Sequence, residues 1–217
     1  GGNPFPNATV ILTNGAAVWP QSANSQDMTI YDGYFSLNGA DCDGDIGIYG
    51  DCRIDFYTGN SMAMGGDVSG DGRLFLADSS NPIDLHGSIS PGASIGDLEL
   101  DANDHSAMTI GSTDNVTLNI EVNGATADTL NLVDWAAAQD LAVIDLNMTA
   151  AGSVNGETNV IMTCDAGFTG DFNSESWESG TSGDVWVDGN DVKAAMIPEP
   201  GVAIMGVAAL ALLARRK

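Results

Sequence analysis

Two neighbouring stretches in the middle of the chain decide the fold: GDGRLFL at residues 70–76 and LHGSISPGASIGDLEL at residues 85–100. In both, short apolar or β-branched runs stand between Gly, Asp and Ser, which is the pattern of short strands joined by tight turns. Similar runs recur along the chain at intervals of about 8 to 15 residues. The clearest lie at residues 10–12, 28–30, 33–37, 98–100, 108–110, 116–120 and 160–162. We therefore predict an all-β domain, with the one short helical pattern at residues 136–141.

Residues 66–172 resemble the β-helical passenger segments of autotransporters. The resemblance lies in the two stretches above and continues through residues 118–124, 127–132, 159–162 and 168–172. It implies a right-handed parallel β-helix, or solenoid, in which stacked strands bury ladders of Leu, Ile and Val and place Gly and Asn at the corners. No strict sequence period accompanies it, and a β-sandwich or jelly roll is the alternative fold.

The charge of the chain is strongly negative. Among 217 residues, 30 Asp and Glu stand against 6 Lys and Arg, and the formal net charge is −24. Such a surface repels nucleic-acid phosphates and anionic lipid and attracts cations, Ca²⁺ above all. We therefore expect no nucleic-acid partner. The hydrophobic fraction of 43% is sufficient for a core, so the chain is expected to fold.

The C-terminus combines three segments in a fixed order. Pro198-Glu199-Pro200 precedes an uncharged apolar stretch at residues 201–214, which is followed by Arg215-Arg216-Lys217. The two prolines are expected to prevent helix formation and strand pairing, leaving an accessible peptide. At about 1.5 Å per residue the apolar helix reaches roughly 21 Å, which suits a transient anchor better than a permanent span. The basic end is expected to stay in the cytoplasm, with residues 1–196 outside.

These three segments resemble the PEP-CTERM sorting domain of Gram-negative bacteria. In that family the tail is recognised by exosortase, a membrane protease-transpeptidase, and the proteins accompany exopolysaccharide, biofilm or floc production. The resemblance implies a protein exported to the cell surface or extracellular matrix, held transiently in the inner membrane. We divide the chain into a β-solenoid domain at residues 1–192 and a linker with the sorting tail at residues 193–217.

One stretch has the spacing of a calcium-binding loop. Asp67, Ser69, Asp71 and Asp78 occupy positions 1, 3, 5 and 12 of such a loop, with Gly72 at position 6. This stretch also resembles the calcium loop of dockerin modules. A plain turn with solvated aspartates is the alternative, because no amphipathic helix follows.

The cysteines raise a second structural possibility. In an oxidising compartment Cys42 and Cys52 could close a short disulfide loop, which would leave Cys164 unpaired. The sequence offers no nucleophile motif near either histidine, His86 or His105, so we do not expect an enzyme.

The function expected from the whole sequence is a structural or adhesive role beside exopolysaccharide. Its acidic surface would bind cations and cross-link to anionic polysaccharide. Two rival functions remain open: a carbohydrate-binding or carbohydrate-cleaving β-domain with the same tail, and a self-assembling coat or filament subunit.

Overall fold

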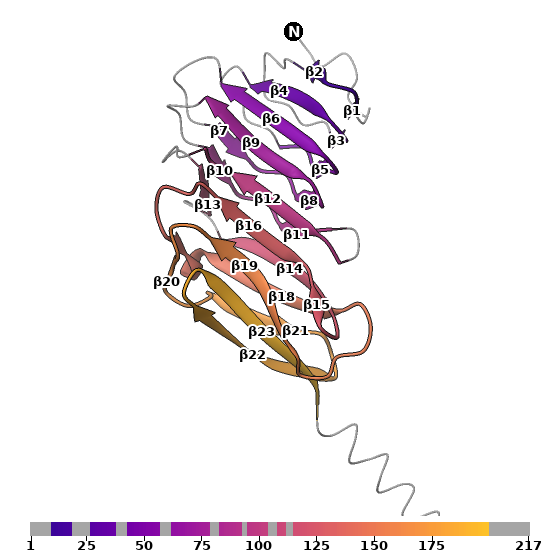
Figure 1. Ribbon diagram of the computed structural model, residues 1–217, viewed down its shortest axis with the longest axis vertical. Coiled ribbons are helices and arrows are strands. Elements are labelled where there is room, and N and C mark those ends of the chain that lie inside the picture. The colour runs from indigo at the N-terminus through magenta and orange to yellow at the C-terminus, as the bar shows by residue number, and fades with distance from the viewer. Residues whose placement is uncertain are drawn as a thin grey trace, which may run out of the picture.

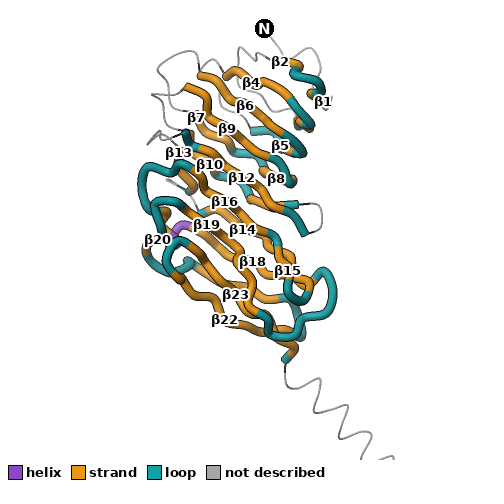
Figure 2. The backbone as a smooth tube through the Cα atoms, viewed as in Figure 1, coloured by secondary structure: helices purple, strands orange, loops and turns teal. Residues whose placement is uncertain are grey.

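The computed structural model describes residues 10–18, 27–37, 43–56, 62–78, 83–92, 95–103, 108–111 and 115–199, and nearly all of its regular structure is β-strand (Figures 1 and 2). Sheet A contains β1 (Val10–Leu12), β3 (Met28–Ile30), β5 (Ile46–Ile48), β8 (Val68–Gly70), β11 (Ile89–Pro91), β14 (Val116–Asn123), β18 (Ile144–Ala150) and β21 (Ser174–Trp177), with β15 (Thr126–Ala127) beside β14. Sheet B contains β2 (Ala16–Val18), β4 (Gly33–Leu37), β6 (Asp51–Phe56), β9 (Arg73–Asp78), β12 (Asp97–Asp101), β16 (Thr129–Val133), β19 (Thr158–Cys164), β23 (Asp191–Pro198) and β22 (Thr181–Asp188).

Two smaller sheets form a third side. Sheet C contains β7 (Met62–Met64), β10 (Ile83–Leu85) and β13 (Met108–Ile110), and sheet D contains β17 (Gln139–Asp140) and β20 (Phe168–Thr169). The chain visits sheet A, then sheet B, then the third side, and each pass is called a layer here. Figure 1 shows the strands of sheet B one below another, from β4 near the N-terminus to β22.

Neighbouring layers pair in parallel and in register, and their length changes along the chain. Hydrogen bonds from a side chain to the equivalent position of the next layer span 18, 22 and 21 residues in the early layers. In the later layers they span 29, 28 and 29 residues. This change explains why the sequence shows no strict period. The parallel pairing also argues against the jelly-roll alternative, whose strands run antiparallel.

The core is built from ladders of apolar side chains, one rung per layer. In sheet A the register places Met28, Ile46, Val68, Ile89, Leu118 and Leu146 in one column, and each is at most 2% exposed. In sheet B the equivalent column is Cys52, Leu74, Leu100, Leu132 and Cys164, each at most 1% exposed. Burying one Leu, Ile or Met side chain contributes about 1.5–3 kcal/mol, so the ladders are a major source of stability.

Antiparallel strands close the C-terminal end of the stack. β23 pairs antiparallel with both β19 and β22, and the half-buried Trp177 packs against the core. Residues 193–198, expected to form a linker, therefore lie in a strand. The cause is an alternating pattern in which Val192, Ala194 and Met196 are each at most 1% exposed, so this segment buries an apolar face.

The predicted all-β class is confirmed, and each of the predicted runs named above lies in a strand. The helical pattern at residues 136–141 does not form an α-helix, because β17 occupies Gln139–Asp140. The one helical element of the described residues is the 3-10 turn η1, which spans Leu141–Val143. In the part of the chain that the structure describes, no helix is long and apolar enough to span a membrane. The apolar stretch at residues 201–214 lies outside that part.

The two described cysteines are free thiols in the core. Cys52 and Cys164 occupy inward positions of sheet B, so Cys52 forms no disulfide in the structure, and Cys42 lies outside the described residues. The expected Cys42–Cys52 bridge is therefore corrected. Burial raises the pKa of Cys52 to about 12 and also raises the pKa of Cys164, because a thiolate is poorly solvated there.

We predict that neither core thiol reacts with iodoacetamide in the native protein, since the thiolate is the reactive form. The measurement is peptide mass spectrometry of a Cys42→Ser variant, alkylated near pH 8 with and without denaturant. Full alkylation of Cys52 and Cys164 only in denaturant is expected. Rapid native alkylation of Cys52 would show that the inward face of β6 is open to solvent.

Candidate functional site

Three carboxylates form a column where the chain enters sheet A. Asp27, Asp45 and Asp67 directly precede β3, β5 and β8, and all three side chains are exposed. Oδ1 of Asp27 accepts the N–H of Asp45 at 3.2 Å, and Oδ1 of Asp45 accepts the N–H of Asp67 at 2.9 Å. Oδ1 of Asp67 accepts the N–H and the hydroxyl of Ser88 at 2.8 and 2.6 Å. Each carboxylate therefore ties its layer to the next.

The same column concentrates negative charge. Paired strands lie about 4.8 Å apart, and two unit charges at that spacing repel by about 1 kcal/mol in water. Asp145 lies at the equivalent position of a later layer, where hydrogen bonds from Ser174, Asn173 and Asn115 lower its pKa and keep it ionised. A cation beside the column would relieve the repulsion without needing a closed coordination cage.

The predicted calcium loop is not folded as one. Asp67 precedes β8, Ser69 lies within β8, Asp71 lies in the following corner and Asp78 ends β9. Because β8 belongs to sheet A and β9 to sheet B, these residues are distributed around a corner between two sheets. Nowhere in the described ranges do three or more His, Cys, Asp or Glu side chains gather to hold a metal ion. The plain-turn alternative fits this segment better.

A ladder of amides and hydroxyls, not predicted from the sequence, runs along the outer face of sheet A. Asn119 donates to Ser90 Oγ at 3.0 Å, Asn147 donates to Asn119 Oδ1 at 2.9 Å, and Ser176 donates to Asn147 Oδ1 at 2.9 Å. The available signal was the recurrence of Leu-Asn-apolar at residues 118–120 and 146–148. This ladder makes the outer face polar but uncharged along its centre.

A shallow cleft of about 490 Å³ opens on sheet B. It spans four layers and is lined by Gly50, Asp51, Asp71, Gly72, Arg73, Asp97, Glu99 and Asn131. Arg73 Nε lies 2.7 Å from Glu99 Oε1, its Nη2 donates to the carboxylate of Asp101, and its guanidinium lies 5.0 Å from the centre of the Phe75 ring. The hydrogen bond to Asp101 is the main reason that the pKa of Arg73 is raised. The cleft therefore offers mainly carboxylate acceptors to a ligand.

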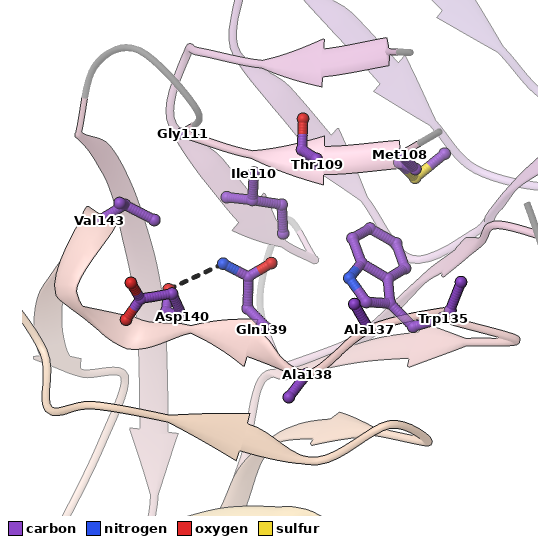
Figure 3. Close-up of a pocket in the computed structure, with 11 residues that line it drawn as sticks. Met108, Thr109, Ile110, Gly111, Trp135, Ala137, Ala138, Gln139, Asp140 and Val143 are labelled. Atoms are coloured by element: carbon purple, nitrogen blue, oxygen red, sulfur yellow. Dashed lines mark hydrogen bonds between the residues drawn. The ribbon is translucent and has the colours of Figure 1, made fainter. Parts of the chain in front are cut away.

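A second, apolar pocket lies where the third side is interrupted between sheets C and D. It has a volume of about 250 Å³ and lies between β13 and the segment from Trp135 to Val143 (Figure 3). The Trp135 ring and the Gln139 amide both point toward β13, and Gln139 Nε2 donates to the carbonyl of Asp140 at 2.8 Å. The carboxylate of Asp140 accepts the N–H of Ala142, so it is already used in capping η1.

One buried carboxylate joins two layers beside the cleft. Asp128 is 2% exposed and accepts the N–H groups of Gly96 and Glu121 at 2.9 and 2.8 Å. Burial raises its pKa to about 6, with help from the charges of Glu121 and Asp97 and against the effect of the two N–H donors. The folded state therefore binds this proton more tightly than the unfolded chain does.

We predict that stability rises as the pH falls from 7 to 5. A carboxyl group with a folded pKa of about 6 and an unfolded value of 3.8 contributes about 1.4 kcal/mol over that window, and the contribution disappears as the pH rises through 6. Urea unfolding at both pH values measures it. Asp128→Asn should flatten the pH dependence by about that amount. An unchanged slope in the variant would assign the effect to other acids.

The predicted sorting motif begins inside the last sheet. Pro198 ends β23 opposite Thr181, and the N–H of Glu199 donates to the carbonyl of Gly180 at 2.9 Å. The expectation that the prolines prevent pairing is wrong for Pro198. Hydrogen-bonded and non-hydrogen-bonded pairs alternate in antiparallel strands, and the Glu199–Gly180 bond places Pro198 at a non-hydrogen-bonded position that needs no N–H.

The remaining tail residues lie outside the described part of the chain: Pro200, Arg215, Arg216 and Lys217. No protein-family model and no curated protein matches the chain. The sorting tail thus stays a prediction that rests on residues 198–217 themselves.

Proposed function

We propose that this chain is a non-catalytic protein of the bacterial surface or extracellular matrix, exported and then sorted through its C-terminal tail by exosortase. Its body would be a right-handed parallel β-helix, which the in-register parallel layers and the fixed order of the sheets support. The body would extend to about residue 199, because β23 continues to Pro198. In such a stack each layer contacts only its neighbours, and equivalent positions of successive layers lie side by side on an extended surface.

The acidic column is the observation that carries the structural or adhesive role. Asp27, Asp45 and Asp67 present exposed carboxylates in successive layers, on a chain whose net charge is −24. Divalent cations gathered along this column would bridge to carboxylates of an anionic polysaccharide, because both surfaces carry negative charge and share the counter-ion. Calcium is then a bridging partner rather than a resident ion.

Calorimetric titration with alginate, with calcium or with sodium at matched ionic strength, tests the bridging role. The variant Asp27→Asn/Asp45→Asn/Asp67→Asn keeps the acceptor oxygens and should weaken calcium-dependent binding about tenfold, since about 0.5 kcal/mol per charge is lost. The control Glu157→Gln/Asp171→Asn/Asp184→Asn removes equal charge from exposed positions elsewhere. Equal loss in both variants would contradict a role for the column.

Sorting is tested separately by the C-terminal mass of the exported product in a Gram-negative host with and without exosortase. Removal of the apolar tail should need both the enzyme and an intact motif. The variant Pro198→Ala/Glu199→Ala/Pro200→Ala is the control. An uncut tail in every case would contradict sorting and leave a membrane-anchored β-domain.

The cleft around Arg73 favours a second candidate, a carbohydrate-binding domain. Its carboxylates from successive layers, with Asn131, could accept the hydroxyl donors of a glycan lying along the stack. Direct binding of a neutral glycan without calcium, weakened by Asp97→Asn/Glu99→Gln, would support this candidate. Binding of alginate alone, dependent on calcium, would support the first.

A further inference from the structure

We propose that the junction between the body and the tail is a strand-paired gate, so that the sorting motif is recognised only after residues 197–199 separate from β22. This inference rests on the proposed sorting of the tail. It concerns when the motif is accessible, and it follows from where Pro198 and Glu199 lie in the last sheet.

The end of β23 is held from one side. β19 pairs with β23 as far as Ala195, opposite Thr158, and the N–H of Gly156 donates to the carbonyl of Met196 at 3.0 Å. Beyond Met196 the described partners of the backbone belong to β22 and the turn before it. Ile197 lies opposite Ser182, Pro198 opposite Thr181, and Glu199 bonds to Gly180.

Burial sets how far the strand can separate. Ile197 is 41% exposed, and Pro198 and Glu199 are exposed, so separating these three residues uncovers less apolar surface than separating the buried core residues before them would. Met196 is 1% exposed and belongs to the core, so further separation would open the end of the hydrophobic ladder. The gate is therefore three residues long and opens without unfolding the body.

Pairing with β22 competes with binding by an enzyme. Extended peptides are commonly bound by adding a strand to the receptor, which uses the N–H and C=O groups of the peptide backbone. The N–H of Glu199 is engaged by Gly180, and β22 covers the edge of the segment that presents this N–H. When opening is fast relative to cleavage, the cutting rate follows the population of the open form.

A disulfide across the gate tests the inference. Ser182→Cys/Ile197→Cys joins a directly opposed pair beside the motif, and Asp184→Cys/Ala195→Cys joins the next equivalent pair farther into the hairpin as a matched control. Both are made with Cys42→Ser in the full chain, leaving the buried Cys52 and Cys164. Tail removal is followed by mass spectrometry in detergent with exosortase-containing membranes, with and without dithiothreitol.

We expect the oxidised Ser182–Ile197 lock to slow tail removal at least tenfold, dithiothreitol to restore it, and the control lock to leave it unchanged. Amide hydrogen exchange at Glu199 should slow in the same variant, which shows that the cross-link closes the junction. Cutting of the oxidised lock at the full rate would overturn the gate while leaving sorting intact. Failure to cut even the unmodified chain would overturn the proposed sorting, and the gate with it.

Discussion

Gly70→Ala is expected to lower the free energy of unfolding by about 4 kcal/mol, the largest effect of any single substitution proposed for this chain. Gly70 ends β8 with φ +118°, a conformation that L-residues rarely adopt. A Cβ at this position would lie 1.9 Å from the carbonyl oxygen of Ile48 in the preceding layer. Ile48 and Pro91 pair with Gly70 from the two neighbouring layers, and Gly92 donates to its carbonyl at 2.7 Å, so the backbone is fixed on both sides.

Gly189→Ala separates the clash from the backbone strain. Gly189 has φ +67° in the β22–β23 turn, and a Cβ there would meet nothing within 4 Å. Its substitution should cost only about 1–2 kcal/mol, the strain of a left-handed conformation. Urea unfolding followed by circular dichroism measures both variants. Equal losses would mean that the layers can slide apart at Gly70, contrary to the close stacking described above.

The strands were predictable from sequence because their signal is local. The run at residues 116–120 alternates apolar and polar side chains, and the structure buries Val116, Leu118 and Ile120 while leaving Thr117 exposed. The pairing of parallel strands was harder to predict from sequence, because it joins residues 17 to 32 positions apart and the layer length changes. Resemblance to a known architecture, rather than periodicity, therefore led to the expectation of parallel layers.

The candidate sites were predictable only in part, because charge can be counted but its placement depends on register. The spacing of acids predicted a calcium loop around Asp67, whereas the structure uses its carboxylate as an acceptor for the next layer. Predicting the Asp27–Asp45–Asp67 column would have required knowing which residues of neighbouring layers are opposite one another. Pro198 illustrates the same limit. A proline fits an antiparallel strand at a non-hydrogen-bonded position, and which positions those are depends on how the strand pairs with its neighbour.

Arg73→Met is expected to lower the free energy of unfolding by about 3 kcal/mol near neutral pH. Asp101 is 1% exposed, and Arg73 donates to its carboxylate from the outer face of β9. Removing the guanidinium leaves a buried carboxylate that still accepts the N–H of Asn103 at 2.8 Å but has lost its cationic partner, with Glu99 nearby as a like charge. The side chain of Arg73 is 42% exposed, so the expected loss of stability lies at the lower end of the range for breaking a buried ion pair.

A double-mutant cycle with Asp101→Asn assigns that loss to the orphaned charge. The introduced amide would keep an oxygen for the N–H of Asn103 but carry no charge, so Arg73→Met should cost about 1 kcal/mol or less in that background. Arg53→Met, at an exposed position of the neighbouring strand β6, is the matched control and should change stability by about 0.5 kcal/mol or less. Equal costs of Arg73→Met in both backgrounds would show that Arg73 acts through packing on Phe75 instead, because the charge on Asp101 would then have no influence on the result.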